Sequence, residues 1–447
     1  MTDYEKILEF IDTLQIIDTH EHLPMEAERD PRADVLTEWL GQYFVCDLLS
    51  AGLPEEALAK VRDASQDLMK RWALLEPFWE AARSTGYGRA LDLAAKGVYG
   101  IDGVGRRTIG PLNEAFKAAR DKGGHYRTVL KEKSRIALSL VDANLACDRE
   151  FFASVVRLEE FIMPAHLRDV RAAGAKVGVR VHRLEDWEEA MRLTLERALE
   201  EGAVAMKMGL AYMRPLEFKK VDRASAERDF LALFDPDNAP DWRPGLKVGR
   251  AFQDWMMHAM FRMADQKGLT VQVHTGIQEG SGNVMSDARP SLLSNLLLEY
   301  RNVRFDLFHM GYPWLLELGV LAKNFPSVHI DMCWGHIISP EAARRGLTEW
   351  LDTVPATKIS AFGGDHSFVD GVYGHQILAR QNVAASLAAK VAGGSMDLDR
   401  ARQIAQWVFI ANPTRLFGLA DRLKAAGAGK PGAKKEPKVK LRPTPVE

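Results

Sequence analysis

From about residue 134 onward, short apolar runs rich in β-branched residues alternate with longer segments whose apolar residues recur every three or four positions. The first pattern is typical of buried strands and the second of amphipathic helices, so their alternation predicts parallel βα units. One further apolar run lies near the N-terminus. The strands are predicted at residues 16–20, 135–142, 151–158, 204–210, 269–276, 303–311, 328–335 and 358–365.

Eight βα units favour an α/β fold of the closed (β/α)8 type, a TIM barrel, over an open sheet. Residues 175–182 are a competing strand candidate that would change the count. Helices of suitable length to cover the sheet are predicted at 186–202, 289–301, 313–325 and 339–354, and a last helix at 395–419 packs as a cap.

The remaining segments surround this barrel. Residues 1–14 have the pattern of an amphipathic helix, and residues 26–133 read as a helical insertion after the first strand. The glycine-rich fragment 103–108 has no third glycine and no preceding strand, which excludes a dinucleotide loop. We expect a single domain over residues 1–425, followed by a disordered basic tail at 426–447 that is rich in Gly, Pro and Lys.

Composition narrows the class of partner. The 447 residues are 47% hydrophobic and 27% charged, which excludes disorder for most of the chain. A formal charge of −2 gives no electrostatic case for nucleic acid or an anionic membrane, so we expect a small-molecule partner. With no C-x-x-C pair, no signal-like apolar run and no membrane span, a cytoplasmic protein is expected. The Trp-containing insertion offers contact surface for a homo-oligomer.

Histidines and an aspartate stand at the predicted strand ends. In a parallel barrel these ends converge on one face, where catalytic groups are found. Neutral imidazole and carboxylate are suitable ligands for zinc, manganese or iron. The sequence therefore predicts a site for one or two divalent ions, zinc first, with manganese or iron as alternatives. Its candidate residues are His20, His22, His274, His309 and Asp365, and Lys207 lies in another of these strands.

The segments around these residues, IIDTHEHLP, AMKMG, VQVHTG, LFHMG and FGGDH, resemble the metal-ligand motifs of the amidohydrolase superfamily, and the layout is similar to its metal-dependent hydrolase and uronate isomerase branches. The resemblance implies that His20, His22 and Asp365 bind one metal, and that His274 and His309 bind a second metal or support the substrate. It also implies a carboxylated Lys207 as a bridging ligand. A lysine that pairs with an acidic neighbour or a substrate carboxylate is an equal alternative.

Hydrolysis of an amide, lactone or ester by a metal-activated water is the first expectation, with Asp365 as the general base. The alternatives are a uronate isomerase-like enzyme that moves a proton between adjacent carbons of a sugar acid, and a metal-dependent decarboxylase of an aromatic acid. A non-catalytic barrel is disfavoured because all the ligand positions are filled.

Substrate contacts are expected from polar and aromatic residues in the loops after the strands. Arg180 and His182 join them if residues 175–182 form a strand. An arginine there would favour a carboxylate or phosphate. The main candidates are Tyr212, Arg214, Gln278, Trp334, His336 and His366.

Overall fold

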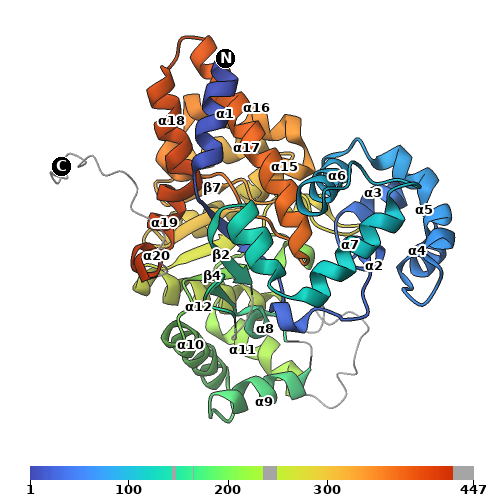
Figure 1. Ribbon diagram of the computed structural model, residues 1–447. Coiled ribbons are helices and arrows are strands. Elements are labelled where there is room, and N and C mark those ends of the chain that lie inside the picture. Colours follow the sequence, from blue (N-terminus) through green and yellow to red (C-terminus); the bar gives the residue numbers. More distant parts are fainter. Residues whose placement is uncertain (143–146, 165, 235–248, 426–447) are drawn as a thin grey trace.

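The computed structural model describes residues 1–142, 147–164, 166–234 and 249–425, in which eight parallel strands follow one another in chain order (Figure 1). Backbone bonds from Thr19 N–H to the Phe362 carbonyl (3.0 Å) and from Asp365 N–H to the His20 carbonyl (2.7 Å) join the first strand to the segment after the last. The predicted (β/α)8 barrel is confirmed. Its strands are β1 (Ile16–Glu21), β2 (Ile136–Asp142), β3 (Phe152–Arg157), β4 (Ala205–Met208), β5 (Thr270–Val273), β6 (Arg304–Leu307), β7 (Val328–Asp331) and β8 (Ile359–Ser360).

The strands are buried along nearly their whole length, which explains why they read as continuous apolar runs in the sequence. Strands β5 to β8 end earlier than predicted, because the residues predicted at their ends belong to the loops that follow. His274 comes directly after β5, His309 opens a short turn after β6, and Asp365 lies five positions beyond β8. The candidate ligands therefore lie at the carboxyl-end mouth of the barrel.

Helices cover the outside of the sheet. The competing strand at 175–182 does not form, because its first residues complete a helix and the carboxylate of Asp186 accepts the His182 N–H (3.0 Å) at the start of the next helix. Both Arg180 and His182 are exposed. The helices between β3 and β5 are α8 (Glu159–Ile162), α9 (Leu167–Lys176), α10 (Leu184–Glu200), η3 (Leu210–Tyr212), α11 (Arg223–Leu231), η4 (Ala232–Phe234) and α12 (Arg250–Lys267).

Two predicted helices are divided in the structure. The helix expected at 289–301 is a 3₁₀ turn followed by a short helix, and the one at 395–419 is interrupted by a π-helical turn. The helices after β5 are η6 (Met285–Ala288), η7 (Pro290–Leu293), α13 (Ser294–Glu299), η8 (His309–Gly311), α14 (Leu315–Asn324), α15 (Gly335–Ile338), α16 (Pro340–Thr353), η9 (Ala356–Lys358), α17 (Val369–Ala392), α18 (Leu398–Gln406), η10 (Trp407–Ala411), α19 (Asn412–Leu416) and α20 (Ala420–Ala425).

In the described ranges, no helix combines the length and the apolar character needed to cross a membrane. The tail predicted at 426–447 lies outside these ranges.

The segment between β1 and β2 is helical, as predicted, and its helices α2 to α7 gather on one side of the barrel (Figure 1). It has a hydrophobic core of its own, in which Trp72, Trp79 and Phe116 are fully buried and to which Phe368 of the barrel contributes. Its helices are η1 (Glu26–Glu28), α2 (Val35–Trp39), α3 (Phe44–Ser50), α4 (Glu55–Arg62), α5 (Leu68–Ala82), α6 (Gly86–Tyr99), α7 (Ile109–Lys122) and the π-helical η2 (Arg127–Lys133), while α1 (Asp3–Thr13) packs on α17.

Asp370, at the start of α17, connects the insertion to the barrel. Its buried carboxylate accepts hydrogen bonds from Trp39 Nε1 (2.9 Å) and Tyr99 Oη (2.7 Å), and it lies 2.7 Å from His125 Nε2. Burial raises the pKa of Asp370, but these partners outweigh burial and hold the pKa below its usual range. Three separate parts of the insertion thus meet one ionised carboxylate.

We expect Asp370→Leu to lower the free energy of unfolding by about 3 kcal/mol or more, since it leaves buried donors without an acceptor. Urea unfolding followed by circular dichroism measures the change. The matched control is Asp102→Leu, whose side chain is 87% exposed and pairs only with a surface lysine, so its cost should stay below about 1 kcal/mol. Equal costs for the two variants would contradict the anchoring role.

Candidate metal centre

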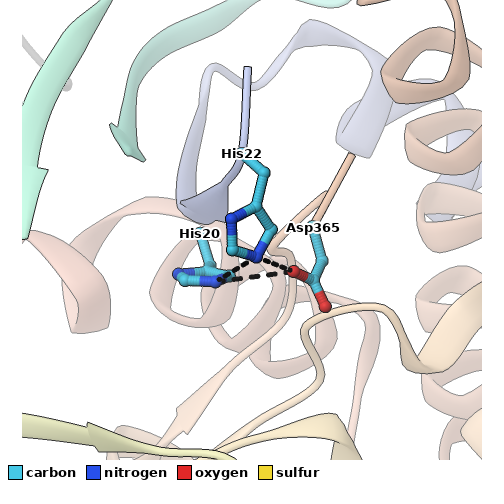
Figure 2. Close-up of side chains that lie close together, drawn as sticks. All are labelled: His20, His22 and Asp365. Atoms are coloured by element: carbon cyan, nitrogen blue, oxygen red, sulfur yellow. Dashed lines mark hydrogen bonds and ion pairs between the residues drawn. The ribbon is translucent and has the colours of Figure 1, made fainter. Parts of the chain in front are cut away.

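Three predicted metal ligands converge where β1 meets the segment after β8 (Figure 2). Nε2 of His20 lies 3.3 Å from Nε2 of His22 and 3.4 Å from Oδ1 of Asp365, and His22 Nε2 lies 3.1 Å from the same oxygen. A tetrahedral ion with bonds of about 2.1 Å holds its ligand atoms about 3.4 Å apart. The three atoms therefore fit a divalent ion, and two imidazoles with one carboxylate are ligands that zinc, manganese and iron accept.

The protonation states of these residues also suit a metal. Burial raises the pKa of Asp365, but the hydrogen bond from His22 and the electrostatic interactions with His20 and His309 outweigh burial and hold the pKa well below its usual range. Burial lowers the pKa of His20 well below its usual value, and the charge of Lys207 lowers it further. At neutral pH the carboxylate is ionised and His20 is neutral, as metal ligation requires.

The backbone around Asp365 is hydrogen-bonded to β1. Asp365 has φ of +60°, a left-handed conformation that costs a non-glycine residue about 1 kcal/mol or more and that its surroundings must maintain. A Cβ at Gly364 would lie 1.9 Å from Glu21 Oε1, so only glycine fits there. Three successive N–H groups donate to β1: Gly364 to the Asp18 carboxylate (3.0 Å), Asp365 to the His20 carbonyl (2.7 Å) and His366 to the Glu21 carboxylate (2.7 Å).

His274 and His309 lie beside these ligands and contact each other. His309 Nε2 is 2.9 Å from His274 Nδ1 and 3.8 Å from Asp365 Oδ2. Their other ring nitrogens face backbone carbonyls, that of Ile277 for His274 (3.0 Å) and that of Cys333 for His309 (3.1 Å). Ligand atoms of His309, Cys333 and Asp365 also lie within 4.8 Å of one another. Because carbonyls only accept hydrogen bonds and burial lowers the pKa of both histidines, the ring N–H of each donates to its carbonyl, and Nδ1 of His274 and Nε2 of His309 face each other unprotonated.

Lys207 points into the same region from β4. It is buried, and its Nζ lies 3.7 Å from the centre of the Phe308 ring. Burial lowers the pKa of Lys207, and the charge of Asp365 acts in the opposite direction.

A cavity of about 210 Å³ opens beside these residues. Its wall includes Arg157, whose Nε donates to Asp142 Oδ2 at 2.6 Å. The same Asp142 oxygen lies 3.9 Å from His20 Nε2 and from His22 Nδ1, so the pair adjoins the metal ligands. Apart from Gly209, every lining residue has a polar side chain. The lining residues are His22, Gln42, Tyr43, Arg157, Lys207, Gly209, Tyr212, His274, Glu279 and Asp365.

The sequence also matches a known family of proteins. A family model described as Amidohydrolase matches residues 135–419, which is more than half of the chain. The chain belongs to the amidohydrolase family. The match covers β2 to β8 and leaves the amidohydrolase chain's β1 and helical insertion outside it.

Two curated proteins and one solved structure are similar to this amidohydrolase. Protein fluG of Emericella nidulans is 23% identical over 54% of this chain and 29% of its own length. Uronate isomerase of Cutibacterium acnes is 26% identical over 62% of this chain and 62% of its own length. The chain thus spans less than two thirds of either relative. The structure of uronate isomerase from Thermotoga maritima superposes with a TM-score of 0.75 at 15% identity, covering 93% of this chain and 97% of that one, which is a likeness of fold.

Of the substrate contacts predicted for the amidohydrolase barrel, Tyr212 lines the cavity and its ring packs on His274, with ring centres 4.6 Å apart. Gln278 and Arg214 face elsewhere. The Gln278 amide donates to the Ala211 carbonyl (2.8 Å), and the Arg214 guanidinium donates to Asp254 Oδ1 (2.6 Å). Both therefore hold loops near the mouth.

Trp334, His336 and His366 lie behind the cavity wall. The Trp334 ring stacks on Tyr43 (4.6 Å between centres) and meets His309 edge-on, and the buried His366 ring meets the edge of Tyr43. His336 Nε2 faces the Ala361 carbonyl at 2.8 Å, inside the protein. These three side chains support residues of the site and do not line the cavity.

Sequence reasoning missed Arg157, Gln42 and Tyr43 of the cavity wall, and Asp142, which pairs with Arg157. Asp142 and Arg157 stand at the ends of the second and third predicted strands, so the strand-end argument that found the other ligands would have found them too. Gln42 and Tyr43 come from the loop between α2 and α3, and no periodicity or motif in the insertion marks them.

Stability at acidic pH tests the burial of His336. Burial lowers its pKa from 6.5 to about 4, so the unfolded chain takes up this proton before the folded one does as the pH falls. The stabilisation is complete above pH 6.5 and is lost as the pH falls towards 4. We expect the free energy of unfolding to drop by about 2 kcal/mol more in the parent than in His336→Gln between pH 7.5 and 4.5, measured by urea unfolding. Parallel pH profiles would contradict this assignment.

Proposed function

We propose that the protein is a metal-dependent isomerase of small sugar acids of the uronate class, with one divalent ion held by His20, His22 and Asp365. The observation that carries this proposal is the small polar cavity beside these residues, whose wall includes the basic side chains of Arg157 and Lys207. The similarity to the Cutibacterium acnes uronate isomerase supports the same choice.

The cavity suits a small polar substrate. Its volume of about 210 Å³ admits a molecule the size of a single sugar acid, and its polar wall offers hydrogen bonds to several hydroxyl groups. Arg157 and Lys207 supply positive charge on that wall, and a guanidinium or ammonium group binds a carboxylate well. A carboxylate-bearing polyol meets both conditions.

The reaction needs a proton to be moved between adjacent carbons. In the open-chain aldehyde form, a base removes the proton from C2, a proton is returned to C1, and the O2 hydroxyl proton passes to O1, so an aldose becomes a ketose with no atom gained or lost. Asp365 is ionised and is the group placed to accept the C2 proton, through Oδ2 on the side that faces His309. A divalent ion bound here would polarise the carbonyl oxygen.

A hydrolase is the second candidate, and Lys207 is the residue that favours it. Its buried ammonium has a lowered pKa, which increases the share of neutral amine that can react with carbon dioxide to form a carbamate. Such a carbamate would bridge two ions and serve the hydrolysis of an amide, lactone or ester. Zinc is the first expected metal for either reaction, with manganese or iron as alternatives.

The direct test is to incubate the protein, loaded with Zn²⁺ or Mn²⁺, with a panel of uronates, lactones and N-acyl amino acids, and to follow the products by NMR. We expect a uronate to be converted to the corresponding keto acid. Hydrolysis of a lactone or amide without conversion of any uronate would contradict the proposal in favour of the hydrolase.

Asp365→Asn should lower kcat by about 10³-fold, because the amide can neither accept the proton nor ligate the ion as a carboxylate does. Its circular dichroism spectrum should match that of the parent, since the backbone bonds of residue 365 are retained. Near-parental kcat in the purified variant would rule out this role.

Lys207→Met distinguishes the two candidates. If Lys207 binds the substrate carboxylate, the variant should have a KM raised about tenfold or more and should keep one bound metal ion per chain by elemental analysis. Loss of one of two ions on substitution would instead support the carbamate-bridged hydrolase.

A further inference from the structure

The side chain of Gln42, from the insertion, bridges the backbone on both sides of His366. Its Nε2 donates to the Asp365 carbonyl (2.9 Å), and its Oε1 accepts from the Ser367 N–H (2.7 Å) and hydroxyl (3.1 Å). The carboxamide therefore pairs with the chain as a peptide group of a neighbouring strand would. A side chain needs both a donor and an acceptor at this length to do so, and glutamine has both.

These bonds act on the strained residue of the metal site. Asp365 adopts φ of +60°, and its N–H is held by the β1 carbonyl of His20. Its carbonyl accepts instead from Gln42 Nε2 and from the hydroxyl of Tyr43, which both belong to the insertion. The barrel thus holds one side of the Asp365 peptide segment and the insertion holds the other.

The loop that carries Gln42 is itself fixed in place. Tyr43 has φ of +43°, and its ring stacks on Trp334 of the barrel (4.6 Å between centres) and on Tyr87 of the insertion (5.6 Å), which also contact each other. Its backbone N–H also stabilises the Glu279 carboxylate, in the loop after β5, and lowers the pKa of that group, which burial raises. Contacts with two barrel loops and one insertion helix therefore present Gln42 in a defined position.

We propose that Gln42 is a positioning residue, which keeps Asp365 in its metal-binding conformation and makes the affinity of the site for a divalent ion depend on the helical insertion. The inference rests on the metal site proposed above. Gln42 acts through the backbone of Asp365, so its removal displaces a ligand without removing one. Loss of such an outer partner of a metal ligand typically costs 10–100-fold in metal affinity.

The test uses the full-length protein and Co²⁺, whose visible absorption reports coordination geometry. We expect Gln42→Met to weaken Co²⁺ binding about tenfold, measured by competition with a chelator, and to change the absorption band. The free energy of unfolding of the metal-free protein is measured in parallel. A purely structural role would lower this free energy and leave both Co²⁺ affinity and absorption unchanged.

The matched control is Gln66→Met, at an exposed glutamine of the same insertion. Among the described residues, the Gln66 side chain donates to Asp63 and Ser65 of its own turn. Its Co²⁺ affinity and absorption should equal those of the parent. If Gln42→Met does not fold, Tyr43→Phe is used instead, because it removes the other donor to the Asp365 carbonyl. Its Co²⁺ affinity and absorption are measured and interpreted as for Gln42→Met. A loss of affinity below about threefold in the folded variant overturns the inference while leaving the metal site intact. A parent protein that binds no Co²⁺ overturns the inference together with the metal site.

Discussion

The placement of Asp365 is the constraint on which the rest of the site depends. The last strand ends five residues earlier, so the ligand is carried by a loop, and its left-handed backbone is not a conformation that the loop would keep unaided. Four successive N–H groups, from residue 364 to residue 367, donate to partners in β1 and the insertion. This candidate metal ligand is thereby fixed by hydrogen bonds between segments more than 300 residues apart in sequence.

This arrangement links the fold to the chemistry. The partners from β1 alternate along the strand with the metal ligands, so that Asp18 and Glu21 hold the Asp365 loop while His20 faces the same loop with its ring. The insertion is held against this part of the barrel, because its residues Trp39 and Tyr99 donate to Asp370 of α17 and its Tyr43 stacks on Trp334. The carboxylate of Asp365, the candidate ligand, is consequently buried, ionised and held in one position by the protein itself.

The sequence could predict the barrel and most of the site because both follow from simple periodicities. Alternation of strands and helices identified the βα units, and the ends of parallel strands converge, so His20, His22, His274, His309 and Asp365 could be placed together without a structure. The same rule applied to β2 and β3 would have added Asp142 and Arg157. It fails for Gln42 and Tyr43, whose position depends on how the insertion packs against distant loops.

Loop residues were the least predictable part of the site. Arg214 and Tyr212 are two positions apart, yet one pairs with Asp254 in α12 and the other lines the cavity. Whether a polar side chain in a loop faces the cavity or a structural partner is decided by tertiary contacts that leave no local pattern, and His336, turned inward to a carbonyl, illustrates the same limit.

Anomalous diffraction from crystals grown with Zn²⁺ or Mn²⁺, recorded at the absorption edge of the metal, tests the central claim most directly. The account predicts a single ion bonded to His20 Nε2, His22 Nε2 and a carboxylate oxygen of Asp365. Two ions bridged by a carboxylated Lys207, or an ion bound away from Asp365, would contradict it.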